Sequence, residues 1–150
     1  LPPVPVGDLS GDGKPDIAMA AGMTSAVAVY TNRGDGMFAD KVEYPVIGSA
    51  TFVALADVDG DGKKDLVSAN RLGNTISVLK NQGAGAFDSP ADYPTGLKPN
   101  AVCAADFDGD GDPDFAVGLG PQVSNTPEKT HWLAVWRNQR IPGRKERPDL

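Results

Sequence analysis

The segment Asp8-Leu-Ser-Gly-Asp-Gly-Lys-Pro-Asp16 decides the fold of this 150-residue chain, because it occurs three times at a constant interval. It returns as Asp57-Val-Asp-Gly-Asp-Gly-Lys-Lys-Asp65 and as Asp106-Phe-Asp-Gly-Asp-Gly-Asp-Pro-Asp114. The first aspartates of successive copies are 49 residues apart in both steps. A constant period of this length indicates a repeat protein in which each unit is one supersecondary structure.

Short apolar runs flank each copy and predict β-strands. A first run precedes the second and third copies, at residues 52–56 and 101–105. A second run follows every copy, at residues 17–20, 66–69 and 115–118. A third run ends two residues before an asparagine, at residues 26–30, 76–79 and 132–136. They are short, rich in β-branched and aromatic residues, and separated by Gly, Asn and Asp. With a last strand around residues 88–93, each unit has four strands, which predicts an all-β fold of propeller blades.

The repeat also predicts the organisation of the chain. Blade one covers residues 1–48 with an incomplete first strand, blade two 49–97 and blade three 98–139. The second run of unit three is delayed by eight residues, which predicts an inserted surface loop at 120–131, and residues 140–150 form a basic tail. Three blades cannot close a ring. We therefore expect a fragment of a longer propeller, with association of several copies as the alternative.

Composition excludes several classes of protein. The chain has 20 acidic and 14 basic residues, a formal net charge of −6, and 17 of its acidic residues are Asp. Such acidity argues against nucleic-acid binding, and 18 Gly with 13 Pro argue against a helical bundle. No apolar run is long enough for a membrane-spanning helix.

The three Asp-rich segments, here named loops one (8–16), two (57–65) and three (106–114), predict Ca²⁺ sites. Oxygens at loop positions 1, 3, 5 and 9 can converge on one cation, and position 7 offers its backbone carbonyl. All side-chain donors are oxygens, which suits a hard cation. The candidate ligands are Asp8, Ser10, Asp12, Lys14 and Asp16; Asp57, Asp59, Asp61, Lys63 and Asp65; and Asp106, Asp108, Asp110, Asp112 and Asp114. Lys14, Lys63 and Asp112 are expected to act through the backbone carbonyl.

The loops differ from an EF-hand, and they differ in charge. Position 12 is Met19, Ser68 or Val117 instead of a bidentate Glu, and the flanking residues predict strands. Loop one has the fewest carboxylates, so we expect it to bind Ca²⁺ most weakly. Twelve of the 20 acidic residues lie in the loops, and three Ca²⁺ ions would bring the formal charge from −6 to zero. The alternative interpretation is solvated Asp-Gly turns.

Two further motifs accompany the loops. Asn-x-Gly-x-Gly-x-Phe occurs at 32–38 and 81–87, and Tyr-Pro follows at 44–45 and 93–94. Together with the loops, these motifs resemble the FG-GAP/VCBS repeats, the Ca²⁺-loop blades of integrin α-subunit propellers and of many secreted proteins. The resemblance implies a propeller of roughly seven blades, with Ca²⁺ in the hairpin between the first and second strands of each blade. It also implies an extracellular or cell-surface location, or a periplasmic one.

These patterns favour a non-catalytic Ca²⁺-binding module that supports adhesion or recognition of a protein or glycan. The alternatives are the propeller portion of a secreted polysaccharide-active enzyme and a structural subunit of a larger assembly. His131 is the sole histidine, and no Ser-His-Asp or Cys-His arrangement can be assembled. Whether the chain has enzyme activity stays open, with the absence of a catalytic motif favouring none.

A few isolated residues carry further hypotheses. The tripeptide Arg33-Gly34-Asp35 is the one that integrins recognise, but turn chemistry already accounts for its Gly and Asp. Trp136 is expected between blades, whereas Trp132 beside the inserted loop is a candidate for stacking on a sugar. Cys103 lies in an apolar stretch and is expected to be buried.

Overall fold

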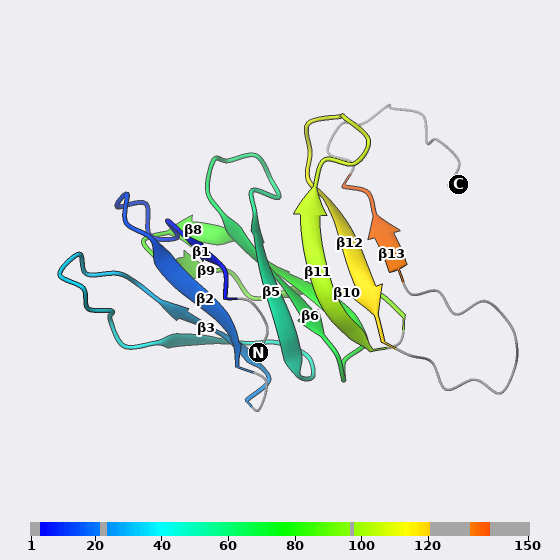
Figure 1. The fold of residues 1–150 in the computed structure, drawn as a ribbon, viewed down its shortest axis with the longest axis horizontal. Helices are drawn as coiled ribbons and strands as arrows, with labels where there is room; N and C mark the ends of the chain where they lie inside the picture. Colours follow the sequence, from blue (N-terminus) through cyan, green and yellow to red (C-terminus); the bar gives the residue numbers. More distant parts are fainter. Residues whose placement is uncertain (1–3, 22–23, 97, 121–132, 139–150) are drawn as a thin grey trace, which may run out of the picture.

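The computed structural model describes residues 4–21, 24–96, 98–120 and 133–138. Within these ranges the chain forms strands and turns and no helix. Three antiparallel sheets follow one another along the sequence, and the second lies between the first and the third (Figure 1). The predicted all-β fold with blade-like sheets is confirmed.

The sheets are simple meanders. The first has the order β1 (Val6–Gly7), β2 (Asp16–Ala21), β3 (Ala26–Tyr30), β4 (Val42–Pro45). The second has the order β5 (Ala50–Ala56), β6 (Asp65–Asn70), β7 (Thr75–Leu79), β10 (Ala91–Pro94), and the hairpin of β8 (Asn81–Gly83) and β9 (Ala86–Phe87) comes between β7 and β10. The third contains β11 (Pro99–Ala105), β12 (Asp114–Leu119) and β13 (Leu133–Trp136). A fourth strand of this unit would follow β13, outside the described residues.

The register of the strands repeats with the sequence. The first two strands of each sheet pair Val6 with Ile17, Leu55 with Leu66, and Ala104 with Phe115. Each partner is therefore displaced by one repeat from its counterpart in the preceding sheet. Loops one, two and three consequently all lie in the hairpin between the first and second strands of their sheet.

An apolar layer fills the space between the first and second sheets. Val27 and Val29 of β3 pack with Val53 of β5 and Leu66 of β6, and all four side chains are buried. Leu9, the second residue of loop one, is buried in the same layer. Leu9 thereby attaches the loop to the core and fixes its position against the second sheet.

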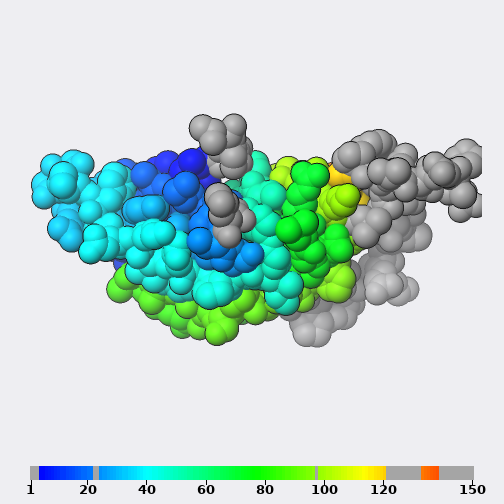
Figure 2. All heavy atoms as spheres, turned by 90° about the horizontal axis from the view of Figure 1, so that it is seen from below, coloured from blue at the N-terminus to red at the C-terminus, as the bar shows by residue number. Residues whose placement is uncertain are grey.

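A second apolar layer lies between the second and third sheets. It contains Val67 and Ile76 from the second sheet and Val102 and Phe115 from the third. Trp136 packs against this layer, as expected from the sequence. All six residues of β6 are buried, because the second sheet is covered on both faces. Figure 2 shows the chain from below, with blue and cyan atoms at one end and green atoms both beneath them and toward the other end.

Cys103 contradicts the sequence-based expectation, because it is exposed. Side chains along β11 alternate between the two faces of the sheet. Val102 points into the second apolar layer and is buried, so its neighbour Cys103 lies on the opposite face. The apolar surroundings of Cys103 in the sequence therefore indicated a strand correctly but did not indicate which face is covered.

Candidate metal centres

The ninth residue of each loop is a buried aspartate that fixes the loop backbone. Asp16, Asp65 and Asp114 are at most 1% exposed. One oxygen of each accepts a hydrogen bond of 2.8–3.0 Å from the backbone N–H of the second loop residue. The other accepts one of 2.7–2.9 Å from the backbone N–H of the asparagine that follows the third strand. Burial raises the pKa of Asp65. Each carboxylate therefore joins the loop to the strand beside it.

The first residue of each loop, Asp8, Asp57 or Asp106, accepts backbone hydrogen bonds from the glycines at positions 4 and 6. The N···O distances are 2.6–2.7 Å for position 4 and 2.8–2.9 Å for position 6. All six glycines have φ between 71° and 91°, a conformation that side chains other than hydrogen rarely adopt. In loop three these N–H donors, foremost that of Gly111, lower the pKa of Asp106.

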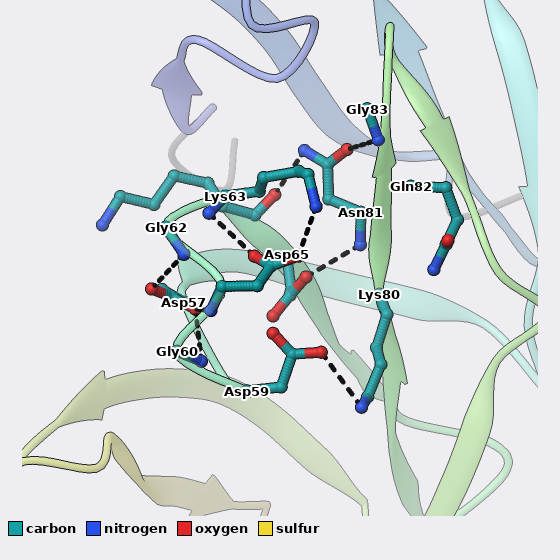
Figure 3. A network of polar contacts seen from close by, with 12 residues as sticks. Asp57, Asp59, Gly60, Gly62, Lys63, Asp65, Lys80, Asn81, Gln82 and Gly83 are labelled. Atoms are coloured by element: carbon teal, nitrogen blue, oxygen red, sulfur yellow. Dashed lines mark hydrogen bonds and ion pairs between the residues drawn. The ribbon is translucent and has the colours of Figure 1, made fainter.

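Loop two gathers three carboxylates. Asp57, Asp59 and Asp61 each place one oxygen within 4.8 Å of the others. Figure 3 shows Asp57 and Asp59 of this group. The Lys80 ammonium lies 3.1 Å from Asp59 Oδ2, and the Lys63 ammonium pairs with Asp61. The hydrogen bond that Lys63 donates to Asp61 lowers the pKa of Asp61. The hydrogen bond that Lys80 donates to Asp59 raises the pKa of Lys80. The other oxygen of Asp59, Oδ1, is buried and has no hydrogen-bond partner.

Loop three gathers a different set of carboxylates. One oxygen each of Asp106, Asp108 and the buried Asp114 lie within 4.8 Å of one another. Position 7 is Asp112, which is buried, whereas loops one and two have a lysine there. The Asp112 backbone N–H donates to Asp110 Oδ1 at 2.9 Å. Loop three thus has the same backbone hydrogen bonds to its first and ninth aspartates as loop two, and it carries more negative charge.

Loop one has a comparable frame but no comparable group of three acidic oxygens among its residues, all of which are described. The Lys14 ammonium lies 2.7 Å from Asp12 Oδ2. Their hydrogen bond lowers the pKa of Asp12 and raises that of Lys14. At position 3, Ser10 Oγ is buried and makes no hydrogen bond of good geometry, although its hydroxyl lies near the Asp12 carboxylate and helps to lower the pKa of Asp12.

The donor sets of the loops fit a hard divalent cation. A buried oxygen without a hydrogen bond is rare and costly, yet Asp59 Oδ1 at position 3 of loop two is one. Carboxylate and hydroxyl oxygens of this kind are ligands of Ca²⁺ and Mg²⁺. The acidic groups of loops two and three can therefore hold a metal ion. The carbonyl role expected of Lys14, Lys63 and Asp112 stays a prediction.

An asparagine bridge between neighbouring units was not foreseen from the sequence. Asn81 Nδ2 donates to the Lys64 carbonyl at 2.9 Å and to the Leu9 carbonyl at 3.0 Å, which joins unit two to loop one. Asn138 Nδ2 donates to the Val58 carbonyl at 2.9 Å, which joins unit three to loop two in the same way. The asparagines are visible in the repeat pattern. Their partners in the neighbouring unit, the carbonyls of Leu9 and Val58, lie 72 and 80 residues away in the sequence.

The tripeptide Arg33-Gly34-Asp35 lies in an exposed turn. The Gly34 N–H donates to Asn32 Oδ1 at 2.8 Å, and Asp35 Oδ1 accepts from the Met37 N–H at 2.9 Å. These contacts are those of a local turn, and adhesion through the tripeptide is untested. His131, Trp132 and the basic tail 140–150 lie outside the described residues.

Repeated antiparallel sheets with an acidic loop in the same hairpin of each unit define a class of all-β repeat proteins. The family described as FG-GAP-like repeat matches residues 8–68 and 57–117. These matches span more than half of the chain, and the chain belongs to this family.

No curated protein matches the chain. A solved structure of the Photorhabdus luminescens Tc holotoxin pore matches over 90% of this chain at 27% identity, with a TM-score of 0.49. This chain spans 6% of the length of the holotoxin chain that it matches. In the described ranges, no helix is long and apolar enough to cross a membrane.

Proposed function

We propose that this chain is a Ca²⁺-binding β-propeller repeat module that is non-catalytic and supports recognition of a protein or glycan outside the cell. The observation that carries the proposal is the buried, partnerless oxygen at position 3 of loop two, Asp59 Oδ1. A bound cation would supply the missing partner to this atom. Membership of the FG-GAP-like repeat family supports the same function.

The residues proposed to hold the ions are the carboxylates and the hydroxyl at positions 1, 3, 5 and 9. In loop two, Asp57, Asp59 and Asp61 are already close together, and Asp65 anchors the backbone behind them. A bound Ca²⁺ would supply positive charge that neutralises carboxylates which otherwise repel one another. The ammonium groups of Lys63 and Lys80 provide part of this compensation in loop two.

Ca²⁺ is favoured over Mg²⁺ because of the form of the loops. A loop of nine residues with glycines at two positions supplies many oxygens without strict octahedral geometry, and Ca²⁺ accepts six to eight such ligands. Mg²⁺ requires near-ideal octahedral geometry and retains water. Selectivity for Ca²⁺ is thus part of the proposal.

The three sheets are proposed to be consecutive blades of a larger propeller, with boundaries near residues 48, 97 and 139. The repeated register and the two apolar layers support this arrangement. The alternative function of a structural subunit is favoured by the apolar side chains exposed on the outer sheets, such as Leu133 and Val135. Both functions require Ca²⁺-loaded loops, and they differ in whether the outer sheets bind another protein chain.

Thermal unfolding with and without Ca²⁺ tests the proposed function. One site at 100-fold excess of Ca²⁺ over its Kd stabilises a protein by about 2.7 kcal/mol, which raises the Tm of a domain of this size by about 5–10 °C. Circular dichroism melts in Ca²⁺, in EDTA and in Mg²⁺ would measure this shift. We expect a large increase of the Tm in Ca²⁺ and a smaller one in Mg²⁺. An unchanged Tm in excess EDTA would refute the proposal.

A further inference from the structure

A continuous path of hydrogen bonds joins the position-9 aspartates of loops one and two. The Asn81 backbone N–H donates to Asp65 Oδ1 at 2.8 Å (Figure 3), and its side-chain Nδ2 donates to the Leu9 carbonyl at 3.0 Å. The Leu9 N–H in turn donates to Asp16 Oδ2 at 2.8 Å. All four residues are at most 3% exposed. The candidate ligands of two separate metal sites are thus connected through one buried asparagine.

The same path recurs one repeat later, between loops two and three. The Asn138 backbone N–H donates to Asp114 Oδ1 at 2.9 Å, and its Nδ2 donates to the Val58 carbonyl at 2.9 Å. The Val58 N–H donates to Asp65 Oδ2 at 2.8 Å. Asp65 therefore accepts a hydrogen bond from one path on each of its two oxygens. The two paths meet at this carboxylate and form one line from loop three to loop one.

Unit two makes a second contact with loop one beside this path. The Ala84 N–H in the β8–β9 hairpin donates to the Ser10 carbonyl at 3.0 Å. The Gly83 N–H of the same hairpin donates to Asn81 Oδ1 at 2.8 Å, so the hairpin also orients the Asn81 side chain. The carbonyls of Leu9 and Ser10 thus both accept from unit two. Unit two therefore holds the backbone on both sides of Ser10, which is a candidate ligand of loop one.

This arrangement connects the order of one loop to the order of the next. A cation that binds a loop holds several oxygens in fixed positions, so it restricts the motion of that loop. Because Asp65 is a candidate ligand and accepts the Asn81 N–H, an ion in loop two would also restrict Asn81. Loop one then loses less conformational freedom when it binds its own ion, which favours binding. Linkage requires an ion in loop one to favour binding in loop two by the same factor.

We propose that Asn81 and Asn138 are positioning residues that couple Ca²⁺ binding in neighbouring loops. Asn81 couples loop one to loop two, and Asn138 couples loop two to loop three. An ion in either loop of a pair tightens binding in the other. The coupling rests on the proposed Ca²⁺ binding and goes beyond it, because three separate sites without such a path would fill independently.

A double-mutant cycle tests the coupling between loops one and two. Asp57→Asn combined with Asp59→Asn disables loop two, and the amide NMR signal of Gly13 reports Ca²⁺ binding to loop one. We expect the loss of loop two to raise the Kd of loop one at least about fivefold more in the wild type than in Asn81→Ala. The change of charge in loop two is the same in both backgrounds, so its direct effect on loop one cancels.

Asn32→Ala is the matched control. Asn32 makes equivalent contacts within unit one, where its backbone N–H donates to Asp16 Oδ1 and its Nδ2 donates to the Pro15 carbonyl. It does not lie on the path between loops one and two. The variant removes an equivalent side chain beside loop one and should retain the wild-type coupling. It therefore separates loss of the path from a general loosening of the loop.

Asn138→Ala repeats the measurement on an independent pair of loops. Asp106→Asn combined with Asp108→Asn disables loop three, and the amide signals of Gly62 and Gly111 report loops two and three. Asn138 is half-buried, so its replacement should leave the chain folded, which circular dichroism would check. We expect the coupling between loops two and three to be lost, while that between loops one and two remains.

Two results would overturn the coupling and leave the proposed Ca²⁺ binding intact. One is a Kd of loop one that does not rise when loop two is disabled in the wild type. The other is a coupling of equal size in the wild type and in the folded asparagine variants. Loop signals that do not respond to Ca²⁺ in the wild type would refute the proposed function, and the coupling with it. Failure of the coupling alone is therefore distinguishable from failure of Ca²⁺ binding.

Discussion

Loops one and two have nearly the same backbone and different charges. In both, a buried position-9 aspartate accepts hydrogen bonds from the backbone, and a position-7 lysine pairs with the position-5 aspartate. At position 3, loop one has the Ser10 hydroxyl and loop two has the Asp59 carboxylate, which pairs with Lys80. Hydrogen bonds to the backbone therefore fix the loop shape, while the charge of the candidate metal ligands varies between the loops.

The strongest test of the shared frame is removal of the position-9 carboxylate. Asp65→Ala leaves the buried N–H of Asn81 and the part-buried N–H of Val58 without their acceptor. Hydrogen bonds to charged groups contribute about 1.5–3 kcal/mol each, so we expect a loss of about 3 kcal/mol or more. Asp16→Ala should cause a similar loss, because the frame is the same. Urea denaturation in EDTA would measure both without the contribution of metal.

Asp40→Ala is the control for this experiment. Asp40 is exposed, so its replacement should change the free energy of unfolding by less than about 0.5 kcal/mol. Losses at Asp16 and Asp65 as small as that of the control would contradict the shared frame.

Exchange of the position-3 residue tests the difference in charge. Ser10→Asp should tighten Ca²⁺ binding at loop one by about tenfold, and Asp59→Ser should weaken it at loop two by a similar factor. The amide NMR signals of Gly13 and Gly62, one in each loop, would follow the two sites separately during a Ca²⁺ titration. Equal affinities in the wild type, or no change in either variant, would contradict the interpretation.

A smaller effect is expected from the asparagine that connects units. Asn81→Ala removes the side-chain N–H bonds to the Lys64 and Leu9 carbonyls, whereas Asn32→Ala removes the one to the Pro15 carbonyl. Both variants also remove the Oδ1 acceptor of a glycine N–H, so this loss cancels in the comparison. The difference between the two losses of unfolding free energy isolates one inter-unit hydrogen bond, about 1 kcal/mol. Urea denaturation would measure it. An Asn32→Ala loss as large as that of Asn81→Ala would show that the inter-unit bond contributes nothing.

Much of this fold could be predicted from the sequence because each unit repeats the same local chemistry. Glycines in Asp-Gly turns mark the hairpins, and alternating apolar residues mark the strands beside them. The packing of Trp136 against the second apolar layer follows from its alignment with Leu79. Repetition multiplies such signals, so the strands and the loops could be located without a structure.

Other features depend on contacts between distant residues, which local patterns do not specify. The sequence identifies Asp65 as a candidate metal ligand. It does not show that the Asp65 carboxylate accepts a hydrogen bond from the backbone N–H of Asn81, which belongs to another strand. The apolar neighbours of Cys103 in the sequence predict a core position, whereas Cys103 is exposed in the structure. The bond from Asn81 to Leu9 exists only once two sheets are stacked.

Equilibrium dialysis followed by atomic absorption would count the Ca²⁺ ions that the three loops bind. We expect three Ca²⁺ ions per chain at saturation, with loop one the last to fill. Asp57→Asn combined with Asp59→Asn should reduce the number to two. A wild-type protein that binds no Ca²⁺ at millimolar concentration would show that the loops are not Ca²⁺ sites.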